Sequence, residues 1–490
     1  MFLTYTNILF NIFVLVATFR VDPPVHRHNG FYKAAVYEHP VELPAKIAET
    51  YDEAVGQMLL NLNEYKKQAD IAGSQGVDII VFPEVGIYGF QFDNSSEIEN
   101  YLEYIPNPAE ISWTPCREPD RFNRTKVQTF LSCLAMNNSL FLVANYGDMQ
   151  PCPLVDPNCP NSGHYQYNTN IIFNRKGELI ARYHKQNLFF ETQFQQPINP
   201  EKIFFDTDFG RFGTFTCFDI LFHDPAIPLV EKFNITDVVF PTAWMDALPF
   251  FSAIGFHSSF AVAYNVNFLA ANLHLPSQRF QGSGIYTPDG AEAYYYDRNA
   301  QDGKLLIHDV PIISRTEKKL QNVVFAFGPT ELQYLKNHEF KATVFKDWYN
   351  CVRLGSRKDK ITLCQEGFCC FLSYERDQIV GNYAFGVFNG IHPRNGPYYL
   401  QVCILLKCKS EDNESCGRLT FTADGNFKYF NIRGNFSTPY VTPQVIRSDN
   451  GRLELLPLHS MTYDKTGLTG SARSTPLLET SLIGRVYVSD

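Results

Sequence analysis

Apolar and polar residues follow two different patterns along the chain, and the change between them falls near residue 310. Before this point, apolar residues at helical spacing alternate with short, continuous apolar runs that end at glycine or polar residues. One such helical face, which Gly76 closes, carries Ala54, Met58, Leu59, Leu62 and Tyr65. Helices that alternate with buried strands predict an α/β architecture for this part of the chain.

The continuous apolar runs predict buried strands at residues 77–82, 139–145, 168–173, 178–183, 213–217, 237–240 and 267–271. Asp224 and Pro225 form an N-cap and first-turn pair, which predicts a helix that extends toward Phe233. A second helix is predicted between strands, over residues 251–266.

Beyond Val310 the apolar segments become short, aromatic and β-branched, and clusters of Gly, Asn and Asp separate them. The strands predicted there span residues 368–374, 383–388, 398–406, 427–432 and 482–488. Residues 311–345 show no clear pattern. This part of the chain is therefore expected to form an all-β domain.

The length of 490 residues allows about three domains, or two large ones, and excludes a single small binding module. Hydrophobic residues make up 45% of the chain and aromatic residues 15%, so the chain can bury a large core. The 42 Lys and Arg residues against 51 Asp and Glu residues give a formal net charge of −9. Because no basic run is long enough to follow a phosphate backbone, we expect no nucleic-acid partner.

The cysteine content points to an oxidising compartment, since seven of the 12 cysteines lie between Cys351 and Cys416. The apolar run over residues 8–17 is too short to span a bilayer but long enough for the core of a signal peptide. We therefore expect a secreted, extracellular protein with a signal peptide over residues 1–20. Six N-x-[ST] triplets agree with this and are candidate glycosylation sites, at Asn94, Asn123, Asn137, Asn234, Asn413 and Asn435.

The C-terminal residues give no sign of a lipid anchor. Such an anchor needs a hydrophobic tail of roughly 10 to 20 residues. Here Glu479, Arg485 and Asp490 interrupt every apolar run. We interpret this segment as a final β-strand and expect no lipid anchor.

Side chains that can carry out chemistry follow three of the predicted strands. Glu84 follows the strand over residues 77–82, Lys185 follows that over residues 178–183, and Cys217 ends that over residues 213–217. Taken alone, Glu84 and Lys185 would be more typical of solvated strand ends and loops, and Cys217 would be more typical of a buried, inert cysteine. Together, at one edge of an α/β sheet, a carboxylate, an ammonium and a thiol supply the roles that acyl transfer requires.

The order and separation of three motifs resemble the Glu, Lys, Cys triad of the nitrilase, or carbon-nitrogen hydrolase, superfamily: Phe82-Pro83-Glu84, His184-Lys185 and Thr216-Cys217-Phe218-Asp219. Further stretches resemble its vanin and biotinidase branch, at residues 34–39, 165–170, 216–225, 241–245, 282–285, 368–370 and 398–403. The resemblance implies a four-layer α/β/β/α domain over residues 30–310 and a β-rich base domain over residues 320–490.

Within this branch the length and local sequence look more like a vanin, which implies that the small-molecule amide pantetheine is hydrolysed to pantothenate and cysteamine. Biotinidase-type hydrolysis of biocytin is the alternative. Cys217 would attack the amide, Glu84 would act as base and then as acid, and Lys185 would lie beside the oxyanion, joined by the backbone N–H of Phe218. This mechanism requires no metal and no organic cofactor.

Two parts of the site stay open. Tyr88 and Trp244 are candidate substrate contacts, although core packing is a common role for either. Many nitrilases add a second glutamate that positions the lysine, and Asp148 and Glu191 are the nearest candidates in this chain.

Other interpretations predict different chemistry. In a papain-like pair, His184 or His223 would activate Cys217. A catalytically silent secreted scaffold is a third possibility. A zinc site could be built from cysteines of the second half, namely Cys364, Cys369, Cys403 and Cys408. Excluding Cys217 leaves eleven cysteines (12 minus 1), so at most five disulfide bridges form and one further thiol is left over.

Overall fold

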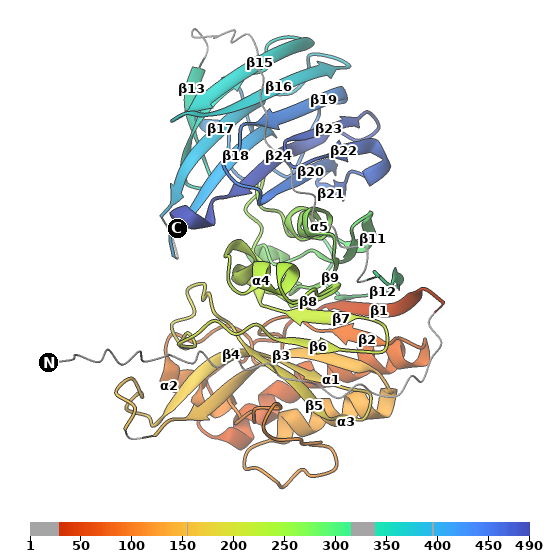
Figure 1. Ribbon diagram of the computed structural model, residues 1–490, viewed down its shortest axis with the longest axis vertical. Helices are drawn as coiled ribbons and strands as arrows, with labels where there is room; N and C mark the ends of the chain where they lie inside the picture. Colours follow the sequence, from red (N-terminus) through yellow and green to blue (C-terminus); the bar gives the residue numbers. More distant parts are fainter. Residues whose placement is uncertain (1–28, 154, 315–338, 394–395) are drawn as a thin grey trace, which may run out of the picture.

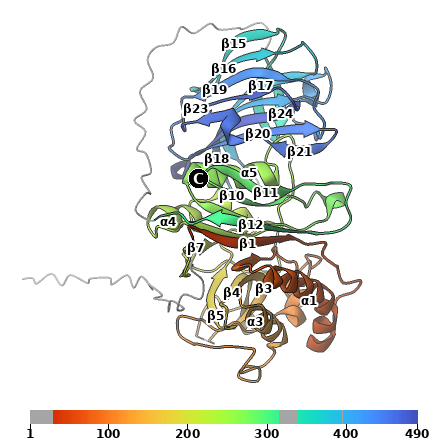
Figure 2. The ribbon, with the colours of Figure 1, turned by 90° about the vertical axis from the view of Figure 1, so that its right-hand side faces the viewer.

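The computed structural model describes residues 29–153, 155–314, 339–393 and 396–490. The predicted signal peptide over residues 1–20 and most of the patternless stretch over residues 311–345 lie outside these ranges. The described chain forms four β-sheets, which stack with two layers of helices along the long axis of the molecule (Figures 1 and 2).

The first sheet has the strand order β12-β1-β2-β3-β4-β5. Its strands are β1 (Phe31–Glu38), β2 (Ile79–Val81), β3 (Phe141–Pro151), β4 (His164–Phe173), β5 (Leu179–His184) and β12 (Lys304–Pro311). β1, β2 and β3 are parallel, whereas β12, β4 and β5 pair antiparallel with their neighbours.

The second sheet repeats this arrangement, with the order β11-β10-β9-β8-β7-β6 and the parallel trio β7, β8 and β9. Its strands are β6 (Phe204–Asp206), β7 (Arg211–Thr214), β8 (Asp237–Pro241), β9 (Asn267–Ala271), β10 (Ser283–Thr287) and β11 (Gly290–Tyr295). Parallel strands are buried on both faces, which explains why the sequence shows them as continuous apolar runs.

The two sheets pack face to face through fully buried side chains, among them Val36 and Val81 of the first sheet and Val239 and Leu269 of the second. Helices α1 (Tyr51–Ser74) and α3 (Lys126–Asn138) cover the outer face of the first sheet, and α4 (Ala226–Glu231) and α5 (Ala253–Tyr264) cover the second (Figure 1). The predicted four-layer α/β/β/α architecture is confirmed. Shorter helices are α2 (Ser95–Ile98) and the 3-10 turns Glu99–Tyr101, Cys217–Leu221, Pro276–Gln278, Asn413–Ser415, Leu458–Ser460 and Tyr487–Ser489.

Helix α1 shows how the sequence pattern succeeded and where it failed. The Thr50 side chain caps the helix by accepting a hydrogen bond from the Glu53 N–H. Met58 and Leu62 are buried as predicted, but Leu59 is 38% exposed. Because one residue turns the helix by about 100°, Leu59 cannot share the face of Met58. A second correction concerns Asp224, which pairs with Lys202 at 2.8 Å, while Pro225 holds the N-cap position of α4.

The second half forms two antiparallel sheets around a core of its own, as predicted. The third sheet, in the order β13-β14-β17-β18-β24-β20-β21, contains Glu339–Val344, Asp347–Arg353, Tyr383–His392, Tyr398–Lys407, Leu477–Arg485, Val441–Asp449 and Arg452–Leu455. The fourth sheet, in the order β15-β16-β19-β23-β22, contains Lys358–Gln365, Phe368–Arg376, Phe427–Gly434, Gly467–Ala472 and Met461–Tyr463. The last strand begins five residues earlier and ends three residues earlier than the predicted range 482–488.

The third sheet docks on α5 and α4 (Figure 2). At this contact, buried apolar side chains of both halves join in one hydrophobic cluster, in addition to the separate core of the second half. Gly255 permits close contact, because a Cβ atom there would lie 2.8 Å from Ile446 Cδ1 and 3.0 Å from Gln444 Oε1. Arg485 on β24 crosses the boundary and donates from Nε to the carbonyl oxygen of Leu221 at 2.6 Å.

Ten cysteines form five disulfides, which matches the expected maximum. The pairs are Cys116–Cys133, Cys152–Cys159, Cys364–Cys369, Cys370–Cys403 and Cys408–Cys416. Cys217 and Cys351 are free and buried. Because all four cysteines of the zinc alternative are in disulfides, that interpretation is wrong.

The candidate glycosylation sites differ in exposure. Asn435 is half-buried, and its side chain accepts a hydrogen bond from the Cys369 N–H at 2.6 Å. The other five asparagines are exposed, and glycosylation at all six stays a prediction. Within the described ranges, no helix combines the length and apolar character needed to cross a membrane.

Glu479 on β24 is a fully buried carboxyl group in the sheet that docks on α5. Burial raises its pKa from 4.5 to about 8, and a contact with Ser481 only partly opposes this shift. Because the unfolded chain releases this proton first, Glu479 favours the folded state below about pH 4.5 and loses that contribution as the pH rises to about 8.

We therefore predict that Glu479→Gln makes the protein more stable than the wild type at pH 8, by up to about 4 kcal/mol, but not at pH 4.5. Thermal unfolding of both proteins at the two pH values measures this. The exposed Glu411→Gln serves as the control and is expected to follow the wild type at both. An identical pH dependence for wild type and Glu479→Gln would contradict the prediction.

Candidate active site

The three predicted residues lie in segments that follow β2, β5 and β7. Glu84 lies beyond Val81, Lys185 follows His184 directly, and Cys217 begins the 3-10 turn Cys217–Leu221. The predicted strand over residues 213–217 ends early, at Thr214, so the thiol lies in a turn rather than on a strand. Cys217 has φ +47°, in the left-handed region that non-glycine residues rarely adopt.

Hydrogen bonds to the Asp219 carboxylate hold the turn Cys217–Leu221 in place. The Asp219 carboxylate accepts hydrogen bonds from the Thr216 N–H at 3.1 Å and from the Tyr183 hydroxyl at 2.6 Å. It also accepts one from the Asn187 N–H at 2.8 Å. The turn that carries Cys217 is thus joined to β5, the strand that precedes Lys185.

The Lys185 ammonium is buried between two carboxylates. Its Nζ lies 2.6 Å from Glu84 Oε1 and 2.5 Å from Glu191 Oε2. Glu84 is 2% exposed and Lys185 is 1% exposed, so these charges are almost completely removed from water. Glu191 is therefore the second carboxylate that the sequence left open, whereas Asp148 lies 2.8 Å from His184 Nε2.

Neutral N–H groups complete the coordination of both carboxylates. The Asn168 amide donates to Glu84 Oε1 at 2.8 Å and to Glu191 Oε1 at 2.5 Å. The Ala243 N–H donates to Glu84 Oε2 at 2.8 Å, and the Phe189 N–H donates to Glu191 Oε2 at 3.0 Å. Each carboxylate is therefore fixed at both oxygens.

The charges of the site shift the pKa values of its members. Burial alone lowers the pKa of Lys185, but the charges of Glu191 and Glu84 outweigh it and hold that pKa well above its ordinary value. Burial, and then the charge of Glu84, raises the pKa of the Cys217 thiol, while Lys185 and the Thr242 hydroxyl oppose the shift. The resting site therefore holds a permanent cation and a protonated thiol, which needs a base before it can attack.

The histidines do not take this role. His184 Nδ1 lies 3.0 Å from Glu201 Oε1, and its Nε2 is engaged by Asp148. His223 is partly exposed and lies 2.8 Å from Asp224 Oδ2. Both rings are thus engaged by carboxylates, and the structure gives no support to a papain-like pair.

A cavity of about 860 Å³ opens over Cys217 and is formed by both halves of the chain. Phe218 and Trp244 line it from the first half, and Lys346, Trp348 and Arg418 line it from the second. Its size falls in the range of about 300 to 1,000 Å³ that is typical of small-molecule sites. The cavity over Cys217 therefore includes a wall that the first half of the chain alone does not supply.

The structure brings Trp244 to this cavity but not Tyr88. Trp244 is anchored by a hydrogen bond from its indole N–H to the carbonyl oxygen of Phe251 at 3.0 Å. Tyr88 is 1% exposed and packs against Tyr146 and Phe194 instead. The Phe218 N–H follows the nucleophile in its turn, and its role as an oxyanion donor stays a prediction.

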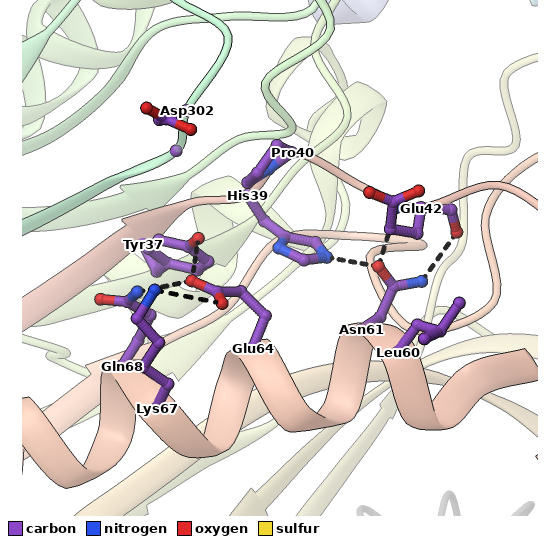
Figure 3. Close-up of a pocket in the computed structure, with 11 residues that line it drawn as sticks. Tyr37, His39, Pro40, Glu42, Leu60, Asn61, Glu64, Lys67, Gln68 and Asp302 are labelled. Carbon is purple, nitrogen blue, oxygen red and sulfur yellow. Dashed lines mark hydrogen bonds and ion pairs between the residues drawn. The ribbon is translucent and has the colours of Figure 1, made fainter.

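A second cavity, of about 670 Å³, lies between α1 and the segment that follows β1 (Figure 3). Several of its polar side chains pair with one another, and Glu64 accepts hydrogen bonds from the Tyr37 hydroxyl at 2.9 Å and from Gln68 at 2.6 Å. His39 Nε2 similarly lies 2.9 Å from Asn61 Oδ1. Because none of the residues lining this cavity carries a thiol, we assign the chemistry to the cavity over Cys217.

Sequence reasoning missed Asn168, Thr242 and Ala243. Two of them contribute through a neutral amide and a backbone N–H, which carry no charge signal in a sequence. The only available hint was that they fall in the stretches 165–170 and 241–245, which carry the family resemblance. In the described ranges, no three His, Cys, Asp or Glu side chains are grouped as a metal site would require.

Comparisons with known proteins match both halves of the chain. The family model "Carbon-nitrogen hydrolase" matches residues 33–233, and "Vanin C-terminal domain" matches residues 338–490. The chain is 46% identical to a pantetheinase of Mus musculus, covering 94% of this chain and 90% of that protein. It is 44% identical to a pantetheinase of Homo sapiens, with the same coverage. A biotinidase of Mus musculus is 38% identical, covering 94% of both chains.

The buried ion cluster predicts a strong effect on stability. Lys185→Met leaves Glu84 and Glu191 facing each other without a cation, so we expect a loss of about 3 to 5 kcal/mol. Lys66→Met, which breaks an exposed pair with Asp70, is the control and should cost no more than about 1 kcal/mol. Denaturant unfolding measures both, and equal losses in the two variants would contradict the prediction.

Proposed function

Because this chain belongs to the carbon-nitrogen hydrolase family, in the group that contains pantetheinases and biotinidases, we propose that it hydrolyses the amide of pantetheine to pantothenate and cysteamine. The observation that carries the proposal is the Lys185 ammonium between Glu84 and Glu191 beside the free Cys217, in a chain 44–46% identical to pantetheinases over most of its length.

In the proposed mechanism, Glu84 removes the proton of the Cys217 thiol as sulfur attacks the carbonyl carbon of the amide. A base is needed because burial raises the pKa of this thiol. Lys185 stays protonated throughout, so its positive charge is available to the negative charge that develops on the carbonyl oxygen. The Phe218 N–H is the proposed second donor to this oxygen.

Collapse of the tetrahedral intermediate breaks the C–N bond. Glu84 returns its proton to the departing cysteamine nitrogen, and a thioester to Cys217 remains. Glu84 then takes a proton from a water molecule as the water oxygen attacks the thioester carbon. When the C–S bond breaks, Glu84 returns this proton to the Cys217 sulfur, and pantothenate is released. One carboxylate thus alternates between base and acid, and its fixed contacts with Asn168 and Ala243 keep it in place for both steps.

We further propose that the protein acts outside the cell. Five disulfides in a chain of this kind support an oxidising compartment. The five exposed N-x-[ST] asparagines are compatible with export.

Biotinidase activity is the second candidate function, favoured by the 38% identity to a biotinidase over 94% of both chains. The deciding experiment expresses the full chain in animal cells and incubates medium and cell extract separately with pantetheine and biocytin. We expect cysteamine to be released faster than lysine, with the activity in the medium. Faster turnover of biocytin would overturn the substrate assignment, and activity confined to the cells would overturn secretion.

The two free cysteines provide a matched pair for testing the nucleophile. We expect Cys217→Ala and Cys217→Ser to abolish hydrolysis, while Cys351→Ala, which removes the free thiol on β14, retains it. Mass spectrometry after brief incubation with pantetheine should find the acyl adduct on Cys217. Retained activity in Cys217→Ala would disprove the mechanism.

A further inference from the structure

We propose that Asn168 is a positioning residue of the active site: its side-chain amide joins the two carboxylates that flank Lys185 and holds Glu84 in the orientation of a base. The inference deepens the proposed function, because it concerns the base of the same reaction. Asn168 lies on β4 and is fully buried. Its backbone carbonyl oxygen accepts a hydrogen bond from the backbone N–H of Lys185 at 2.8 Å.

The amide of Asn168 contacts both carboxylates with one nitrogen. Its Nδ2 donates to Glu84 Oε1 at 2.8 Å and to Glu191 Oε1 at 2.5 Å. Lys185 binds Oε1 of Glu84 but Oε2 of Glu191, so the ammonium and the amide bridge the pair through different combinations of oxygens. Each of the two carboxylates thus binds both the Lys185 ammonium and the Asn168 amide, and it cannot rotate without breaking several hydrogen bonds.

The direction of this amide is set by a chain of buried polar side chains behind it. Asn168 Oδ1 accepts a hydrogen bond from Asn145 Nδ2 at 2.5 Å, which forces Nδ2 of Asn168 toward the carboxylates. Asn145 Oδ1 accepts the N–H of Val85, the residue after Glu84, at 2.9 Å. Asn145 Nδ2 also donates to Asn170, whose amide donates to the Thr214 hydroxyl at 2.9 Å.

This chain connects the two sheets that carry the reacting groups. Asn145, Asn168 and Asn170 belong to the first sheet, whereas Thr214 ends β7, three residues before Cys217. All four side chains are fully buried, and each has a hydrogen-bond partner. A buried polar network in which every group is satisfied specifies one arrangement.

The electrostatics of the site explain why a neutral donor is needed. Two carboxylates share one ammonium, and burial together with the charge of Glu84 raises the pKa of Glu191. Hydrogen bonds donated to an ionised carboxylate favour that form. Removing the Asn168 donor takes a hydrogen bond from each member of this carboxylate pair and therefore favours a proton on the pair as a whole. A pair that already carries a proton is a poorer acceptor for the proton of Cys217.

The test measures the rate at which iodoacetamide alkylates Cys217, across pH 5 to pH 10, together with kcat/KM for pantetheine. In Asn168→Asp the donor becomes a third carboxylate, and we expect the alkylation rate at pH 7 to fall about 10- to 100-fold. The acid limb of both profiles should move to higher pH by about one unit. Asn168→Ser replaces the amide by a shorter hydroxyl without adding charge and should show a smaller shift in the same direction.

The control is Asn267→Asp. Asn267 on β9 is equally buried, and its amide also donates to a carboxylate, that of Asp237, at 2.8 Å. This variant should lose stability but keep the wild-type pH profile.

An unchanged profile in both Asn168 variants, or an equal shift in Asn267→Asp, would overturn the proposal. Alkylation displaces iodide from the reagent and cleaves no amide bond, so it tests Asn168 even if pantetheine is not turned over. Because Asn168→Ser adds no charge, it provides the measurement if Asn168→Asp does not fold.

Discussion

The structure depends on burying one ammonium between two carboxylates. Glu84 follows β2, whereas Lys185 and Glu191 both lie in the segment between β5 and β6. The mutual attraction of the three charges is strong only where water is excluded. Removing such charges from water costs several kcal/mol per ion unless every oxygen and proton finds a partner. The face-to-face sheets exclude the water, and N–H groups of Asn168, Ala243 and Phe189 complete the hydrogen bonding.

The second half of the chain contributes directly to the region around Cys217. Its seven-stranded sheet covers α5 and supplies one wall of the cavity over Cys217. Arg485 donates to the carbonyl oxygen of Leu221, the last residue of the turn that Cys217 begins. The docked sheet therefore supports the far end of the turn that carries Cys217, and the shape of the cavity over Cys217 depends on the contact between the halves.

Sequence patterns predicted the residues of the site that lie just after the ends of strands. Buried parallel strands are visible as apolar runs, so the positions of Glu84, Lys185 and Cys217 relative to the sheets could be predicted. The choice between Glu191 and Asp148 could not, because it depends on how a loop folds back after β5. Asn168 was not predicted because a neutral amide on a strand has no distinctive spacing. Leu59 was assigned to the wrong face of α1 because apolar character alone does not determine which way a helical residue points.

The turn at Cys217 has a consequence for the stability of the whole chain. A cysteine at φ +47° adopts a conformation that glycine accepts at lower cost, and the buried ion cluster nearby would be more stable as a packed apolar core. The left-handed backbone and the three buried charges therefore concentrate unfavourable free energy in one small region. The packing of the remaining fold must offset this free energy, so the region around Cys217 limits how stable the folded chain can be.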